Sequence, residues 1–190
     1  MKKSKLKFCF LFLIFFSFIT GAQARNEETP PYKNLYSEGP FQVRSYPKML
    51  VAKATRKNGD NLFRTIADYI FGNNENKEEI PMTAPVFSFW RKNYQTMMFY
   101  MPSNYQSLEE LPLPNNEEVT LGNFSLGKVA VVRFSGYNSE RAQRKNLSRL
   151  RKWINKNGLE IRSNSYYSAV YDSPYVPARK RTNEVIIKLK

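Results

Sequence analysis

Histidine is absent from this chain, and cysteine occurs once, as Cys9, among its 190 residues. Without histidine the chain cannot build a histidine-dependent catalytic triad, an imidazole proton shuttle or an imidazole-bound zinc site. Cys9 lies in the apolar N-terminal segment, so the rest of the chain has no disulfide or thiolate chemistry. A transition-metal site would need oxygen or thioether ligands alone, and we therefore expect no metal site.

Common catalytic motifs are missing as well, since the chain has no GxSxG elbow, no HExxH and no glycine-rich phosphate loop. The acidic pairs Glu109-Glu110 and Glu117-Glu118 lie in a polar, proline-containing stretch, without the apolar setting that catalytic carboxylates use. We expect these pairs to be solvated, no residue to be catalytic and the protein not to be an enzyme. One alternative stays open, in which Glu184 and a tyrosine hydrolyse a small electrophile.

Acidic residues are few beside basic ones, with 16 Asp and Glu against 30 Lys and Arg and a net charge of +14. Basic residues crowd positions 139–158, SERAQRKNLSRLRKWINKNG. Such a segment suits nucleic acid, an anionic lipid surface or plain solvation. No helix-turn-helix, zinc or single-strand-binding signature accompanies the charge, so we expect no nucleic acid and keep an anionic membrane surface as a candidate partner.

The first 24 residues combine a basic start, an apolar run from Phe8 to Ile19 and a small-x-small site at Ala22-Gln23-Ala24. This pattern is typical of a secretory signal peptide. The apolar run is shorter than the roughly 20 residues of a membrane-spanning helix. We therefore expect cleavage before Arg25 and a periplasmic or secreted protein, with a retained membrane anchor as the alternative.

The chain after this segment begins with polar, proline-containing residues. Residues 25–34 are expected to form a flexible lead-in, and the fold should begin near Leu35. One domain then spans residues 35–190. Residues 41–55 are rich in β-branched and aromatic types and predict a strand interrupted at Pro47.

Apolar residues recur at helical spacing from Leu62 to Ile70 and predict a helix there. Asp60 precedes this helix and can cap its N-terminus, while Gly72 can end it. The polar residues 73–79, which follow, should bury nothing.

Two prolines break the stretch from Ile80 to Val86, IPMTAPV. Because proline cannot donate to a sheet ladder, this stretch is either a rigid strand entry or the rim of a pocket that includes Met82. Residues 86–90 and 96–101 predict a hairpin, and residues 103–118 a linker.

The second half of the chain repeats the order of the first. It is predicted to contain a strand at 128–135, a helix from Ser139 as N-cap to about Asn157 with Gly158 as its stop, an extended element at 166–171, a proline-punctuated loop SPYVP and a strand at 184–189.

A strand-helix-strand-strand unit is thus expected twice, at about 35–102 and 119–190. Two such units would pack two helices against a curved, mainly antiparallel sheet or barrel of the α+β class. The groove between helix and sheet is where such a fold could hold a ligand.

The ordered motifs YIFGNN, IPMTAPV, VVRFSGY and YDSPYVPARKRTNEVII resemble the SOUL/haem-binding protein family over nearly the whole chain after the signal peptide. The resemblance implies a distorted antiparallel β-barrel built from two repeated strand-helix-strand-strand halves, with two helices packed on it. It also implies affinity for haem and related tetrapyrroles, which some members of the family have, so haem or another tetrapyrrole is the expected cofactor.

The resemblance places the ligand in an apolar groove beside the first helix, near the SPYVP loop. The implied contact residues belong to that helix, to the MTAPV motif and to the loop: Phe63, Arg64, Ile66, Ala67, Ile70, Met82, Tyr171, Tyr175, Val176 and Arg181. This chain departs from the family pattern after the loop, where Arg179 and Lys180 stand at apolar positions and Thr182 replaces an arginine.

Without histidine, haem would be held mainly by apolar contacts, with an arginine or lysine pairing with the propionates. Met82, Tyr171 and Tyr175 are the candidate axial ligands. The alternatives are another amphipathic small molecule, a cationic small molecule or an anionic lipid surface, and we expect a monomer. For Glu184 two interpretations stay open, a surface charge at a strand end and a carboxylate inside the barrel that receives a cationic ligand.

Overall fold

The computed structural model describes residues 27–190, so the predicted signal peptide lies outside the described residues. The described chain folds into seven strands, two α-helices and two short 3-10 helices. In chain order these are β1 (Lys33–Glu38), β2 (Phe41–Lys57), α1 (Leu62–Ile70), β3 (Val86–Arg91), β4 (Tyr94–Tyr100), η1 (Leu108–Glu110), β5 (Thr120–Ser135), α2 (Glu140–Lys156), β6 (Ile161–Val170), η2 (Ala178–Lys180) and β7 (Thr182–Leu189).

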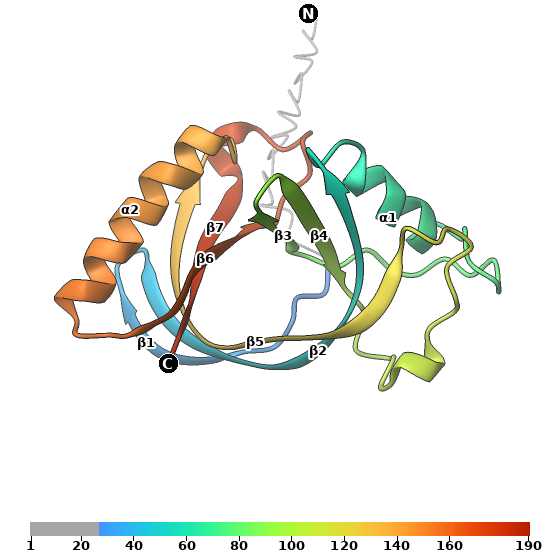
Figure 1. Ribbon diagram of the computed structural model, residues 1–190, viewed down its shortest axis with the longest axis horizontal. Coiled ribbons are helices and arrows are strands. Elements are labelled where there is room, and N and C mark those ends of the chain that lie inside the picture. The colour runs from blue at the N-terminus through green and yellow to red at the C-terminus, as the bar shows by residue number, and fades with distance from the viewer. Residues whose placement is uncertain (1–26) are drawn as a thin grey trace, which may run out of the picture.

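The strands form one antiparallel sheet in the order β1-β2-β4-β3-β6-β7-β5, and β5 pairs back onto β2. Six strands therefore close a barrel, and β1 is added at the edge of β2. The unit β2-α1-β3-β4 is followed by β5-α2-β6-β7, which is the expected element order. Figure 1 shows the two helices on opposite flanks of the barrel, with β2 and β5 running beneath both.

The long strands β2 and β5 hold the two units together. Their pairing runs from Phe41 opposite Val132 to Lys53 opposite Thr120. The predicted interruption at Pro47 does not break β2, because this exposed proline sits where the ladder skips one position. At the other junction β3 pairs with β6, with Phe87 opposite Ala169.

Side-chain alternation on the strands separates one core inside the barrel from two cores under the helices. On β5, Val129 and Val131 belong to the inner cluster, whereas Ala130 and Val132 pack with α2. A third cluster lies under α1 and includes Phe99 of β4. The six strands of the barrel lie between Phe41 and Leu189, all after the predicted cleavage position before Arg25.

Three of the four helix-end predictions are confirmed, and the one for Asp60 is wrong. Ser139 caps α2 as expected, since its Oγ accepts a hydrogen bond of 3.3 Å from the Ala142 amide. Asp60 does not cap α1: the N-cap is Asn61 in the left-handed conformation, and it makes no side-chain cap bond. Gly72 and Gly158 follow the two helices with φ of +99° and +63°, as helix stops require.

Three polar segments contribute more to the fold than expected. Asn74, in the turn predicted to bury nothing, is fully buried, and its side-chain amide donates to the carbonyls of Tyr69 and Glu78. The predicted linker packs Leu111 against the core beneath α1. The fold also begins before Leu35, because Glu28 accepts hydrogen bonds from the Tyr100 hydroxyl and the Ser103 amide.

All three extended elements predicted for the second half begin earlier than expected, β5 at Thr120, β6 at Ile161 and β7 at Thr182. Among residues 27–190, no helix combines the length and apolar character needed to cross a bilayer.

Candidate functional site

The outer face of the barrel next to α1 carries apolar side chains that are exposed or partly exposed, and Phe63 is the one among them that the sequence predicted for a ligand site. Phe63 points outward from α1 with 49% of its surface exposed, and its ring lies 5.4 Å from that of Phe99. Val86 of β3 and Met97 of β4 are partly buried and pack against the cluster that contains Phe99. Trp90 lies on the same side of β3 as Val86, because side chains alternate along a strand, and it is 45% exposed.

We name these four residues, Phe63, Val86, Trp90 and Met97, the apolar strip. On the strands, Met97 pairs with Ser88, which lies between Val86 and Trp90 on the same side of β3. Phe63 and Trp90 are the exposed members of the strip, and exposed apolar side chains can serve as a contact surface.

Three of the four remaining predicted helix residues are core residues and do not line a surface site. Ile66, Ala67 and Ile70 are at most 5% exposed, and Ile66 and Ile70 pack against the sheet in the cluster under α1. The helix turns its apolar face to the sheet, so the apolar residues at helical spacing are buried by packing and do not reach a ligand. Met82 contacts the same cluster and is partly buried, while Arg64 is exposed.

The SPYVP loop starts next to the MTAPV motif, because Val170 at the end of β6 pairs with Val86 at the start of β3. From there its described contacts lead toward α2. Arg181 donates to the carbonyls of Val176 and Pro174, and its guanidinium lies 5.1 Å from the centre of the Tyr137 ring. The Arg181 guanidinium therefore stabilises its own loop.

The other predicted loop residues are divided between the inside and the outside of the molecule. Tyr175 is 94% exposed, and Val176 is partly buried. Tyr171 instead donates from its hydroxyl to Glu184 Oε2, at 2.9 Å. The structure thus leaves Phe63 and Met82 on the α1 flank, each packed against the cluster that contains Phe99, and it directs Tyr171 and Arg181 away from that flank.

A charged cluster lies inside one end of the barrel, and sequence reasoning missed most of it. Arg44 of β2 and Glu184 of β7 are both 0% exposed. Two parallel hydrogen bonds join them, Nη1 to Oε2 at 2.9 Å and Nη2 to Oε1 at 2.7 Å. Arg133 also donates to Glu184 Oε1, at 3.0 Å from its Nη2. Tyr46 accepts from Arg44, and the Tyr32 ring lies 4.3 Å from the guanidinium carbon.

Glu184 therefore lies inside the barrel and not at the surface, but its charge is already compensated by two arginines. Although burial opposes the charged form, hydrogen bonding to Glu184 raises the pKa of Arg44 above its usual range. Burial and the Glu184 carboxylate raise the pKa of Tyr171, which disfavours Tyr171 as a tyrosinate ligand. The cluster has no free carboxylate for a cationic ligand. The alternation of β7 could have placed Glu184 inside, but no sequence signal identified its partner Arg44, 140 positions away.

Two surface hollows, of about 310 and 190 Å³, contain none of the predicted site residues. The larger one lies along α2, and the smaller one lies between the N-terminal segment and the start of the predicted linker. In the part of the chain that the structure describes, no group of three acidic, histidine or cysteine residues could hold a metal ion.

Comparison with known proteins identifies the family of the chain. A sequence profile of the family described as "SOUL heme-binding protein" matches residues 27–188. The chain is 29% identical over 181 residues to Heme-binding protein 2 of Homo sapiens, which covers 86% of this chain and 87% of that protein.

Two solved structures share the fold. An uncharacterized conserved protein from Listeria innocua matches with a TM-score of 0.61 at 11% identity, over 79% of this chain and 92% of that chain. A hydrolase from Listeria innocua matches with a TM-score of 0.57 at 10% identity, over 82% and 94%. These structural similarities support the barrel fold, but at such low sequence identity they say nothing about the chemistry of this chain.

Proposed function

The chain belongs to the SOUL haem-binding protein family, and on this premise we propose that it binds haem or a related tetrapyrrole on the apolar strip, without histidine ligation. The observation that supports this location is the half-exposed Phe63 ring packed on Phe99. An aromatic ring in this position offers a flat apolar contact to a flat ligand.

The propionates need a cation near the strip, and Arg64 suits this role. It is exposed on α1, next in sequence to Phe63, and its side chain has no hydrogen bond or ion pair to another residue of the described chain. A free guanidinium can pair with a carboxylate through two hydrogen bonds. Arg181 is less suitable, because carbonyl groups of its own loop already accept from it.

Iron ligation is not required by this site. Met82 packs beside α1 and has a thioether that can bind iron, and Tyr175 is exposed on the loop. Tyr171 is excluded because its hydroxyl is engaged with Glu184 inside the barrel. We therefore propose that apolar contact supplies most of the affinity and that the iron is dispensable for binding.

The test uses the chain from Arg25 to Lys190, titrated in parallel with haem and with iron-free protoporphyrin. Absorbance in the Soret region reports haem, and porphyrin fluorescence reports the iron-free ligand. We expect saturable binding of both with affinities within about tenfold of each other, a span of ~1.4 kcal/mol. No saturable binding of either would overturn the proposal, and binding of haem alone would show that an iron ligand is essential.

We also propose that the protein is exported, on the evidence of the basic start, apolar run and small-x-small site in residues 1–24. The test is N-terminal sequencing of protein recovered from cells that express the full chain. A sequence starting at Arg25 in the exported fraction is expected, whereas a retained Met1 in the membrane fraction would favour an anchor.

A further inference from the structure

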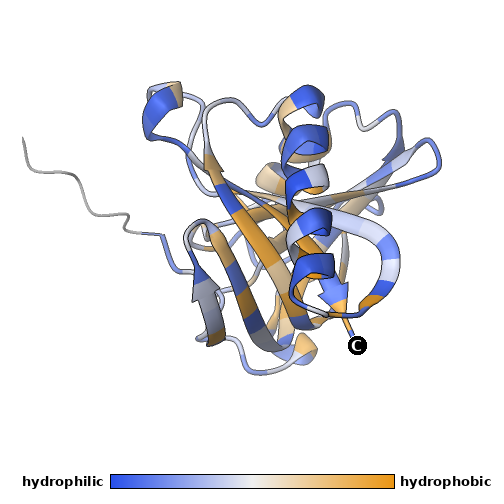
Figure 2. Ribbon diagram, turned by 90° about the vertical axis from the view of Figure 1, so that its left-hand side faces the viewer, coloured by the Kyte–Doolittle hydropathy of each residue, from blue (hydrophilic) through white to orange (hydrophobic). Residues whose placement is uncertain are grey.

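The outward face of α2 carries a dense set of cations that tetrapyrrole binding does not use. The helix has seven basic residues and one acid, Glu140, which pairs with Arg144. All seven are exposed: Arg141, Arg144, Lys145, Arg149, Arg151, Lys152 and Lys156. In Figure 2, which views the barrel from this side, α2 lies in front and is mostly hydrophilic.

Four of these cations have no partner among the described residues, and we name them the basic stripe: Arg141, Lys145, Lys152 and Lys156. Their spacings of four, seven and four residues place them on one side of the helix. The helix of 17 residues is about 25 Å long, so the stripe is long and straight.

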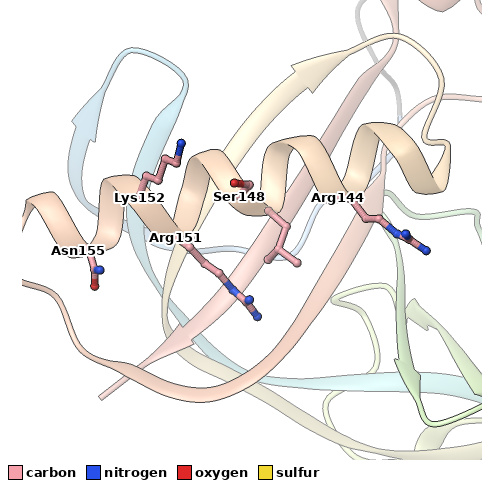
Figure 3. Close-up of a pocket in the computed structure, with 6 residues that line it drawn as sticks. Arg144, Ser148, Arg151, Lys152 and Asn155 are labelled. Atoms are coloured by element: carbon pink, nitrogen blue, oxygen red, sulfur yellow. The ribbon is translucent and has the colours of Figure 1, made fainter.

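A hollow of about 310 Å³ lies along the same helix. Arg144, Ser148, Arg151, Lys152 and Asn155 contribute polar groups to it, and Leu147 lies at its side. Figure 3 shows Arg144 and Arg151 extending on one side of α2 and Lys152 on the other. Hydroxyl, amide and cationic donors around an open hollow can receive phosphate oxygens.

Charge is polarised across the molecule. Seven glutamates lie in the two segments beside α1: Glu75, Glu78, Glu79, Glu109, Glu110, Glu117 and Glu118. These segments are neighbours, because the Glu75 amide donates to the Leu113 carbonyl. Figure 1 places them on the flank opposite α2. An anionic plane would therefore attract the α2 flank and repel the other one.

We propose that the basic stripe docks the protein on a phospholipid surface that carries anionic headgroups. A flat surface matches a straight helix whose whole outer face is positive. The outward residues of α2 include no aromatic side chain on which bases could stack, since Trp153 is buried, and this argues against single-stranded nucleic acid. The apolar strip lies at the opposite helix, so lipid docking leaves it free.

The test uses the Arg25–Lys190 chain and two kinds of vesicle, one of phosphatidylcholine alone and one with about 30% phosphatidylglycerol. The second kind has roughly one anionic headgroup in three, and anionic headgroups attract polybasic segments. We expect sedimentation with the anionic vesicles only, and loss of binding at 0.5 M NaCl, where exposed charges are screened beyond roughly 4 Å. The same protein is offered a duplex DNA of matched phosphate concentration.

The diagnostic variant is Arg141→Gln/Lys145→Gln/Lys152→Gln, which keeps helix propensity because Gln is a good helix former. Each removed charge should weaken binding about fivefold, so the triple variant should lose roughly a hundredfold. The matched control, Lys53→Gln/Lys57→Gln/Arg91→Gln, removes three exposed cations from β2 and β3. Its binding should fall only a few fold. Thermal melting first verifies that both variants are folded.

Three results would overturn the proposal. These are no binding to anionic vesicles at low salt, an equal loss in the control variant, and tighter binding to duplex DNA than to vesicles. None of them bears on the tetrapyrrole proposal, which concerns the other flank.

Discussion

Arg44 and Glu184 face each other inside the barrel as a fully buried, two-bond ion pair, with Nη2 and Oε1 2.7 Å apart. The pair links β2 to β7, strands that belong to different units of the fold. Arg133 and Tyr171 complete the hydrogen bonding of the carboxylate. Since an uncompensated buried charge is costly, this cluster fills the barrel end as structure and not as a ligand pocket.

The change Arg44→Met should therefore destabilise the protein by about 3–5 kcal/mol, because it leaves Glu184 with only the half-exposed Arg133 as a counter-charge. Urea unfolding measures the loss. The control is Arg144→Met, which breaks the exposed pair with Glu140 and should change stability little. Equal effects of the two changes would contradict the structural role of the inner pair.

Alkaline pH should destabilise the fold through Tyr46. Burial raises the pKa of Tyr46 to about 12, from 10.0, although Arg44 opposes the shift. Above pH 10 the unfolded chain therefore loses this proton before the folded protein does. The stabilisation is complete below pH 10 and is lost between about pH 10 and 12, at roughly 1.4 kcal/mol per pH unit for one proton.

Urea unfolding of Tyr46→Phe over this pH range measures that contribution, with the exposed Tyr94→Phe as the control. The slope of stability against pH should be shallower for Tyr46→Phe only. An unchanged slope would mean that the Tyr46 hydroxyl ionises as freely in the fold as in the unfolded chain.

A change at Ile70 should reduce stability without affecting haem binding, although Ile70 lies on α1 as Phe63 does. Ile70 is 1% exposed, so Ile70→Ala should cost about 2–5 kcal/mol of stability. Haem affinity per folded molecule should stay unchanged, because Ile70 does not reach the surface. A selective loss of haem affinity in a stable Ile70→Ala protein would place the ligand beneath the helix.

The two helix starts offer a matched comparison. Ser139→Ala removes the cap of α2 and should cost about 1 kcal/mol. Asp60→Ala should leave the melting midpoint nearly unchanged, since the Asp60 side chain makes no cap bond to α1. Thermal unfolding measures both, and a larger loss from Asp60→Ala would show that this side chain caps the helix in solution.

Patterns in the sequence predicted most of the fold because they record local periodicity. The β3–β4 hairpin and the Ser139 cap were confirmed, since alternation and capping depend on neighbouring residues. The ends of β5 and β6 were missed because polar residues such as Thr120 are held there by pairing with a partner strand and not by their own propensity.

The candidate site was less predictable, because exposure depends on how each element is packed. Helical spacing predicted Ile66 and Ile70 along with Phe63. The packing of α1 against the sheet shows that Ile66 and Ile70 are buried in the core. The register of β3 and β4 added Val86, Met97 and Trp90 to the exposed face. Arg44 was invisible for a different reason, since a lone arginine in a strand is ordinarily a surface residue.

The most direct test of the central claim compares haem titrations of the parent chain with those of Phe63→Ser and Leu35→Ser. The two side chains are similarly exposed, at 49% and 46%, but Leu35 lies on the edge strand β1. Loss of the aromatic contact should weaken haem binding about tenfold in Phe63→Ser, while Leu35→Ser binds like the parent. Equal weakening in both, or a parent chain without a saturable Soret change, would contradict a haem site on the apolar strip.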